Sequence, residues 1–195
     1  MNEKQHIKQL LILAGPSCAG KSTLIKKISH GQLPPSIYKQ LQIKDLSTLP
    51  TFKDDDIKQI MFEQFDGSII LHYDLFNNYI DRNYHQNVLR IIEKFERVTV
   101  ITLSVPNKIL LKRIQLRIIK TFIKLWFKPG YFKSGSIYFG YQWDKYQRYL
   151  RSDIANEIYQ EWYEFTKANW VSSHWILNSS QEQVEMKPVK MLAAK

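Results

Sequence analysis

The segment from Gly15 to Ser22 carries the residue types and spacing of a phosphate-binding loop. Its sequence, GPSCAGKS, matches the pattern G-x-x-x-x-G-K-S/T at every fixed position. A glycine-rich turn points successive backbone N–H groups at an anion, and the helix that follows adds its positive end. Lys21 can reach the β- and γ-phosphates of a nucleoside triphosphate, and the Ser22 hydroxyl can ligate Mg²⁺. The residues expected to bind ATP are Gly15, Pro16, Ser17, Cys18, Ala19, Gly20, Lys21, Ser22 and Thr23.

The residues on either side of this loop fit the same interpretation. The apolar run 10–14 predicts a buried strand directly before the loop. Residues 22–28 carry apolar side chains at 24, 25 and 28, which predicts a helix directly after it, and Gly31 is a suitable helix end. The loop therefore connects a strand to a helix, which is the context that the phosphate-binding pattern requires.

Two aspartates are the main candidates for further chemistry, because each ends a predicted strand. We predict strands at 10–14, 38–46, 68–74, 98–103 and 174–177, which alternate with helices and therefore form a parallel sheet covered on both faces. Ligands bind at the carboxyl ends of such strands. Asp45 ends the second predicted strand and Asp74 the third, so both are expected beside the loop.

The roles of these aspartates stay open at this stage. Asp74 could hold Mg²⁺ together with Ser22, or it could accept the proton of a substrate hydroxyl. Asp45 is a candidate for a substrate-binding base. By contrast, the run Asp54–Asp56 reads as the solvated start of a helix, and His72 reads as a half-buried histidine close to the same rim.

The remaining segments complete one domain over residues 1–178, followed by a polar tail over 179–195 that we expect to be disordered. Helices are predicted over 54–65 and 83–96, from Pro106 onward, and over 146–167. Residues 128–141 contain four glycine or proline positions and read as a loop.

The net charge of +10 belongs to one region of the chain. Residues 106–151 contain eleven Lys or Arg and one acid, whereas the rest of the chain is neutral overall. On the predicted helix after Pro106, an apolar face lies beside a basic face formed by Arg113, Arg117, Lys120, Lys124 and Lys128. Three interpretations compete: a mobile lid over about 118–150, a nucleic-acid or other polyanion site, and an anionic membrane surface. For Arg113 and Arg117 we favour the lid, in which they neutralise charge on the transferred phosphoryl group.

Composition excludes several classes of protein. Apolar residues make up 44% and charged residues 24%, as in ordinary globular domains. No apolar run approaches the length of a transmembrane helix, and the N-terminus lacks the pattern of a signal peptide. The lone cysteine, Cys18, excludes an intramolecular disulfide and a multi-cysteine zinc site. These features lead us to expect a cytoplasmic protein.

The motifs also resemble a known family. The segment GPSCAGKSTL, residues 15–24, resembles the start of guanylate-kinase-like and other small P-loop kinases, within the P-loop NTPase fold. Residues 100–103 followed by 110–117 are similar to the fourth strand and the arginine-bearing helix of these kinases. The resemblance covers 9–30 well and 98–117 in part. It implies ATP, Mg²⁺, a five-stranded parallel sheet of order 2-3-1-4-5 in a three-layer α/β fold, and phosphoryl transfer. The guanine-binding segment of that family, with its arginine pair and tyrosine, is not found.

The sequence therefore predicts an ATP-dependent kinase that acts on a hydroxyl or phosphate of a small metabolite or nucleotide. Two alternatives remain: a polynucleotide 5′-end kinase, suggested by the basic segment, and a non-catalytic ATP-binding regulatory module. The [NT]-K-x-D guanine motif of GTPases is absent from the sequence.

Overall fold

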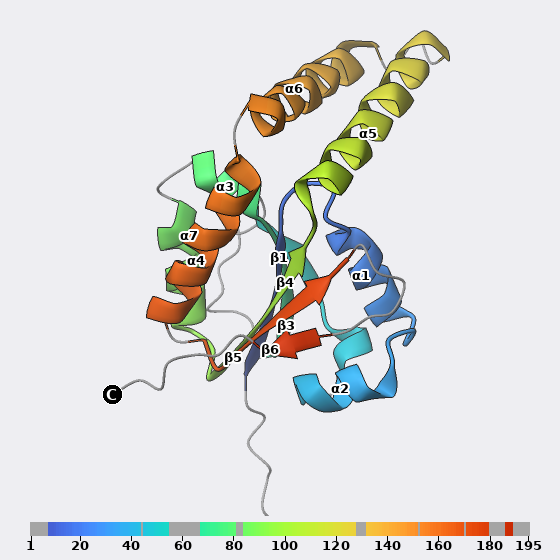
Figure 1. The fold of residues 1–195 in the computed structure, drawn as a ribbon. Coiled ribbons are helices and arrows are strands. Elements are labelled where there is room, and N and C mark those ends of the chain that lie inside the picture. The colour runs from blue at the N-terminus through green and yellow to red at the C-terminus, as the bar shows by residue number, and fades with distance from the viewer. Residues whose placement is uncertain are drawn as a thin grey trace, which may run out of the picture.

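A parallel sheet with helices on both faces forms the body of the protein in our computed structural model (Figure 1). The structure describes residues 8–43, 45–54, 67–80, 84–127, 132–151, 153–169, 171–179 and 186–188. The strands are β1 (Gln9–Gly15), β2 (Thr51–Lys53), β3 (Ile69–Asp74), β4 (Arg97–Ser104), β5 (Ser173–Asn178) and β6 (Met186–Pro188). The helices are α1 (Lys21–Ser29), α2 (Pro35–Leu41), α3 (Leu75–Ile80), α4 (Tyr84–Ile92), α5 (Asn107–Phe127), α6 (Phe132–Arg151) and α7 (Ile154–Ala168), with a short 3-10 helix η1 (Leu46–Thr48).

The order of the strands is β2-β3-β1-β4-β5-β6, and the first five are parallel. This confirms the predicted order 2-3-1-4-5. The register places Gly15 beside Asp74 and Ser104 beside Asn178, so the carboxyl ends of four strands meet at one rim. β1 and β3 are almost wholly buried because helices cover both faces, which explains their continuous apolar sequences.

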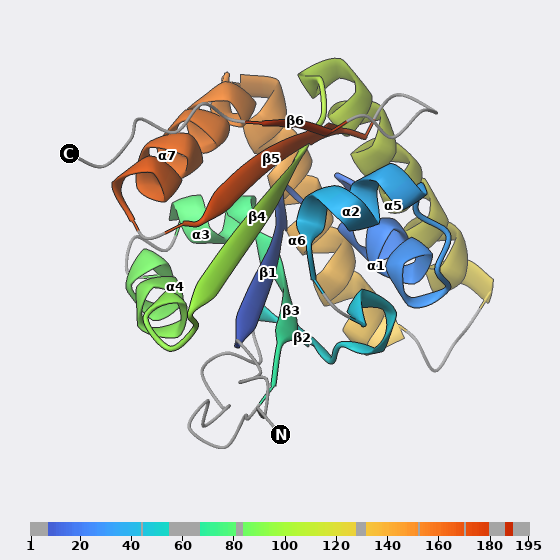
Figure 2. The same cartoon turned by 90° about the horizontal axis from the view of Figure 1, so that it is seen from below.

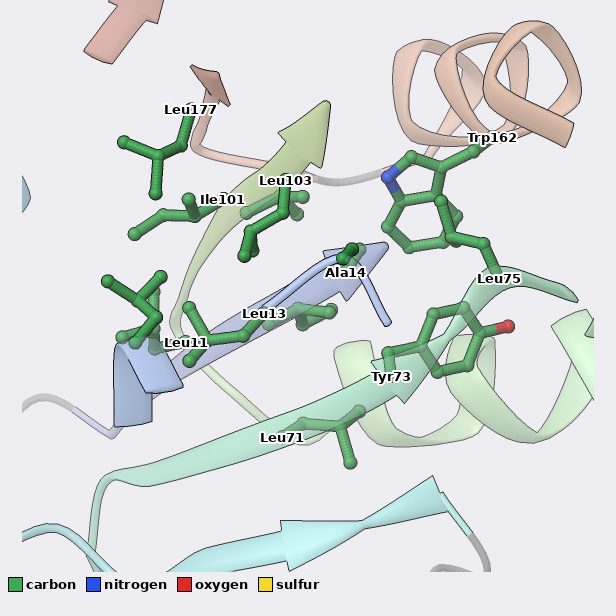
Figure 3. Close-up of a cluster of buried hydrophobic side chains, with 14 of the residues drawn as sticks. Leu11, Leu13, Ala14, Leu71, Tyr73, Leu75, Ile101, Leu103, Trp162 and Leu177 are labelled. Atoms are coloured by element: carbon green, nitrogen blue, oxygen red, sulfur yellow. The ribbon is translucent and has the colours of Figure 1, made fainter. Parts of the chain in front are cut away.

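The helices divide between the two faces of the sheet. In Figure 2, α1 and α2 lie on one side and α4 and α7 on the other. Figure 3 shows Trp162 of α7 pointing toward Tyr73 and Leu75, and the Trp162 and Tyr73 ring centroids are 5.1 Å apart. The Trp162 indole donates to Thr102 Oγ1 at 2.8 Å, and His174 shares a buried hydrogen bond of 2.7 Å with the same hydroxyl. These contacts fix α7 on the sheet.

Helices α5 and α6 lie side by side and extend beyond the carboxyl ends of the strands (Figure 1). We call this pair the α5–α6 hairpin. Its helices contact each other through Phe122 and Phe139, whose ring centroids are 6.3 Å apart, and Gln115 donates to the Tyr146 hydroxyl. Tyr149 joins the base of the hairpin to the body, where its ring lies 5.1 Å from that of Phe76.

Several sequence-based boundaries are wrong. Residues 132–141 are helical rather than a loop, and the helix predicted over 146–167 is interrupted between α6 and α7. The strand predicted over 38–46 is replaced by α2 and η1, and β2 lies later in the chain. The sequence did not predict the antiparallel strand β6, which falls in the expected polar tail. Most of the helix predicted over 54–65 lies outside the described residues.

Candidate functional site

The loop between β1 and α1, residues 15–20, turns tightly at the rim where the parallel strands end. A Cβ atom on Gly15 would lie 3.1 Å from Ala19 Cβ and 3.2 Å from the Leu103 carbonyl oxygen, so only glycine fits without a shift. Gly20 has a φ of 103°, which glycine adopts at little cost, and Cys18 also has a positive φ of 67°. Alternation of right- and left-handed residues is the backbone arrangement of an anion-binding nest, and α1 begins directly after it.

Lys21 is buried at the start of α1, where its ammonium group is surrounded by acceptors. Nζ donates to the carbonyl oxygens of Gly15 and Pro16, the latter at 3.0 Å, and lies 3.4 Å from Asp74 Oδ2. Burial lowers the pKa of Lys21, and the charge of Asp74 opposes that effect. The buried ammonium is therefore held by the carboxylate and the loop carbonyls at the centre of the rim.

Asp74 ends β3 and is buried beside Lys21. Its Oδ2 atom accepts a hydrogen bond from the Ser17 hydroxyl at 2.7 Å, and Oδ1 accepts from the backbone N–H groups of Phe76 at 3.1 Å and Asn77 at 3.2 Å. Burial by itself would raise the pKa of Asp74, but Lys21, Lys145 and these hydrogen bonds lower it to about 2. Asp74 is thus an ionised carboxylate at neutral pH.

Lys145 of α6 is a second buried cation at this rim, and sequence reasoning missed it. Its Nζ atom donates to Ser17 Oγ at 2.6 Å and lies 4.9 Å and 4.3 Å from the ring centroids of Phe76 and Tyr141. Burial lowers the pKa of Lys145, and Asp74 opposes that shift. Gln142, Lys145 and Tyr149 follow helical spacing on one buried face of α6, which is the signal that could have identified the residue.

The carboxylate at the end of β2 is Asp54 and not Asp45. Asp45 directly precedes η1, upstream of β2, and its backbone carbonyl accepts a hydrogen bond from Thr48. It does not line the cavity beside the loop. Asp54 follows β2 directly and is only 4% exposed, in contrast to its predicted place at a solvated helix start. Asp54 Oδ2 accepts the backbone N–H of Asp74 at 2.7 Å and so positions the end of β3.

A cavity of about 610 Å³ adjoins the loop, within the size range of small-molecule sites. Its walls come from the loop, the start of α1, the ends of β3 and β5, and the inner part of α5. The lining residues include Ser17, Cys18, Ala19, Gly20, Lys21, Ser22, Thr23, His72, Asp74, Arg113, Arg117, Lys120 and Ser179. Most of the predicted site residues are therefore brought together around one cavity.

The two predicted arginines of α5 occupy different positions at this cavity. Arg113 Nη1 donates to the carbonyl oxygens of Cys18 and Ala19, each at 3.3 Å, and Nη2 donates to the Ser179 carbonyl oxygen at 2.9 Å. It therefore fastens the loop to the segment after β5. Arg117, one helical turn further along, is exposed on the cavity wall.

His72 lines the same cavity two residues before Asp74. Burial, together with the charge of Lys21, lowers the pKa of His72 to about 4, so its imidazole is neutral at physiological pH. Its Nδ1 atom is buried without a hydrogen-bond partner within the described structure.

The described residues contain no group of three or more His, Cys, Asp or Glu that could hold a metal ion alone. Mg²⁺ does not require such a group, because it commonly binds one or two carboxylates together with substrate phosphates and water. Ser22 and Asp74 supply the oxygen donors that would suit such an ion at this rim. None of the described helices is both long and apolar enough to span a membrane.

Comparisons with known proteins add little to this geometry. No family model matches the chain, and no curated protein matches it. A solved structure described as "a putative kinase from Chloroflexus aurantiacus" is similar, with 21% identity and a TM-score of 0.36, and the match covers 59% of this chain and 69% of that one. At that identity and TM-score, the likeness carries no argument about activity.

Proposed function

We propose that the protein is a Mg²⁺- and ATP-dependent phosphotransferase that moves the γ-phosphoryl group to a hydroxyl or phosphate of a small metabolite or nucleotide. The observation that carries this proposal is the convergence of Lys21, Asp74 and Lys145 on a glycine-rich loop at the carboxyl ends of a parallel sheet. Positively charged donors around an anion-binding nest suit phosphate groups, and the adjoining cavity has room for a small molecule.

In this proposal the loop binds the phosphates of ATP. The backbone N–H groups after Gly15 and the positive end of α1 attract them, and the Lys21 ammonium neutralises their charge. Lys21 exchanges its contacts with the loop carbonyls for phosphate oxygens. Arg113 keeps the loop in the binding conformation, because it holds the Cys18 and Ala19 carbonyl oxygens away from the phosphates.

Asp74 acts with Ser22 on the metal side of the site rather than as a proton acceptor. A carboxylate with a pKa of about 2 is a weak base at neutral pH, whereas its permanent negative charge suits a divalent cation. When bound, Mg²⁺ supplies charge neutralisation to the β- and γ-phosphates. Lys145 reaches Ser17 from the hairpin and adds a second positive charge next to this carboxylate.

The acceptor enters beside α5, and we propose that it carries negative charge. Arg117 and Lys120 line the cavity there, and both are exposed to it. Arg117 can neutralise charge that develops on the transferred phosphoryl group, which is a contribution made mainly in the transition state. A phosphate-bearing metabolite or nucleotide fits this wall best. A 5′-hydroxyl oligonucleotide, whose own phosphates are anionic, is the second candidate acceptor.

The test is ATP consumption with Mg²⁺ in the presence of nucleosides, nucleotides, sugar phosphates and short 5′-hydroxyl oligonucleotides. We expect turnover that depends on one class of acceptor. Arg117→Ala should lower kcat by about a hundredfold with little change in ATP affinity, since one transition-state donor is lost. Lys112→Ala, an exposed substitution on another face of α5, is the matched control and should leave kcat unchanged.

Two outcomes would change the assignment. Tight ATP binding without turnover for any acceptor would favour the ATP-binding regulatory module. Turnover restricted to oligonucleotides, with affinity that falls steeply as salt rises, would favour the polynucleotide 5′-end kinase. An unchanged kcat in Arg117→Ala would remove this arginine from the mechanism while leaving the loop assignment intact.

A further inference from the structure

The α5–α6 hairpin carries all the exposed large hydrophobic side chains among the described residues. On α5 these residues are Leu116, Ile119, Phe122, Ile123, Trp126 and Phe127; on α6 they are Ile137, Tyr138, Tyr141, Trp143 and Leu150. Trp126 is 74% exposed and Phe127 is 81% exposed, at the far end of α5. Single exposed apolar residues are ordinary, but a group of this size confined to one projecting element indicates a binding surface.

Most of the exposed apolar residues of α5 lie on one side of the helix. At about 100° per residue, Leu116, Ile119, Ile123 and Phe127 fall on one stripe. The buried residues Leu110, Ile114, Ile118 and Thr121 fall on roughly the opposite side of the helix. The outer half of α5 is therefore apolar on two faces. An apolar face of a helix is normally covered by other structure, and here only one of the two is.

A basic stripe lies directly beside the exposed apolar one. Arg113, Arg117, Lys120 and Lys124 follow each other at helical spacing, and the first three line the cavity. Toward the far end of the helix, Lys124 is exposed next to Ile123 and Phe127. The segment 106–151 that contains both helices carries a net charge of +10.

We infer that the far end of the α5–α6 hairpin docks on an anionic lipid bilayer surface. Helices that lie in a membrane interface combine Trp, Phe and Leu on one face with Lys and Arg on another, as α5 does. The positive charge of the hairpin complements the negative headgroups, to which each nearby basic residue adds attraction. Trp126 and Phe127 are the residues that enter the headgroup region.

The charge of the hairpin and the chemistry of its exposed side chains favour a bilayer over two other occupants, a second copy of the chain and single-stranded nucleic acid. A second copy of the chain would bring one strongly positive hairpin against another, and the two would repel each other. Single-stranded nucleic acid would attract the lysines, but its bases stack on aromatic rings and leave the stripe of Leu116, Ile119 and Ile123 exposed. A bilayer covers aliphatic and aromatic side chains alike. This inference goes beyond the proposed function and does not depend on it.

The experiment is co-sedimentation of the full chain with vesicles of phosphatidylcholine alone and of phosphatidylcholine with phosphatidylserine, at low and high salt. We expect binding to the anionic vesicles that weakens as salt rises. The double variant Trp126→Ser with Phe127→Ser should partition roughly tenfold less, because two large apolar side chains are lost. Lys124→Glu should bind the anionic vesicles at least about fivefold less than the wild type does.

Lys39→Glu on α2 is the matched control for charge, since Lys39 is exposed and lies on an element away from the hairpin. It should bind vesicles about as well as the wild type, and all variants should unfold at the same urea concentration. The inference is overturned if the wild type does not sediment with anionic vesicles or if the hairpin variants bind equally well. It is also overturned if the same variants instead abolish a concentration-dependent dimer or binding to oligonucleotides.

Discussion

The rim of the sheet and the α5–α6 hairpin break the usual rule of burial in opposite directions. At the rim, Lys21, Asp74 and Lys145 are charged side chains buried almost completely. On the hairpin, Trp126 and Phe127 are large hydrophobic side chains that are mostly exposed. Each arrangement is unfavourable for an isolated folded chain, because buried charges lose hydration and exposed apolar groups order water. The difference is the one that our two proposals require: phosphate groups and Mg²⁺ would compensate the charges at the rim, and a bilayer would cover the apolar side chains of the hairpin.

The same substitution, Asp→Asn, can be made at the buried rim and on the exposed surface of the hairpin, and its effect on stability tests how far the two regions differ in burial. Asp74→Asn removes the negative charge that compensates two buried lysines, and should lower the free energy of unfolding by about 3–5 kcal/mol. Asp144→Asn breaks an exposed pair with Arg148, at 2.8 Å on α6, and should cost less than about 1 kcal/mol. Urea denaturation of both variants measures the two effects. Equal effects would mean that the charges at the rim are hydrated and not buried.

Lys145 connects the two regions, and its removal should separate activity from stability. Lys145→Met keeps most of the side-chain volume and removes the charge beside Ser17 and Asp74. We expect turnover to fall roughly ten- to a hundredfold, while stability changes little because an apolar side chain suits the buried position. Arg148→Met, three residues later and exposed, is the control. If the two variants kept the same kcat, Lys145 would serve only to attach α6 to the body.

Acid should destabilise the body of the protein before it affects Asp74. Burial lowers the pKa values of His72 and His174 to about 4, from about 6.5 when unfolded. The unfolded chain therefore binds more protons between these values, so stability falls as pH falls from about 6.5 toward about 4. Urea midpoints across this range should show the slope, and His174→Gln should reduce it. A flat profile would mean that both imidazoles are hydrated. The described part of the hairpin contains no histidine, so its packing should not contribute.

The sequence predicted well those elements whose pattern has a single explanation. The short apolar runs of β1 and β3 and the β-branched residues of β4 favoured buried strands, and the loop motif predicted the turn between β1 and α1. Asp74 followed directly from the end of its strand. The alternation of strands and helices predicted a parallel sheet, and the resemblance to small P-loop kinases supplied the strand order.

Other elements were wrong because their patterns fit two structures. Residues 38–46 alternate like a strand, but Ile37 and Leu41 are also spaced for a helix that starts at Pro35. The true β2 has only three residues, with exposed Thr51 and Lys53, so Asp54 could not be identified as a strand end. Four glycine or proline positions over 128–141 suggested a loop, although residues 132–141 are helical in α6, which packs against α5. Lys145 was missed because a lysine is expected to be exposed unless its partners are known.

The measurement that tests the central claim most directly is calorimetric titration of the protein with ATP and Mg²⁺. Wild type, Lys21→Ala and Lys26→Ala should be compared; both lysines lie on α1, but Lys21 is buried in the loop and Lys26 is exposed. We predict that wild type and Lys26→Ala bind alike, and that Lys21→Ala loses roughly tenfold or more in affinity, because a charge-assisted contact to phosphate is removed. Equal affinity in all three proteins, or no binding to the wild type, would contradict a nucleotide site in this loop.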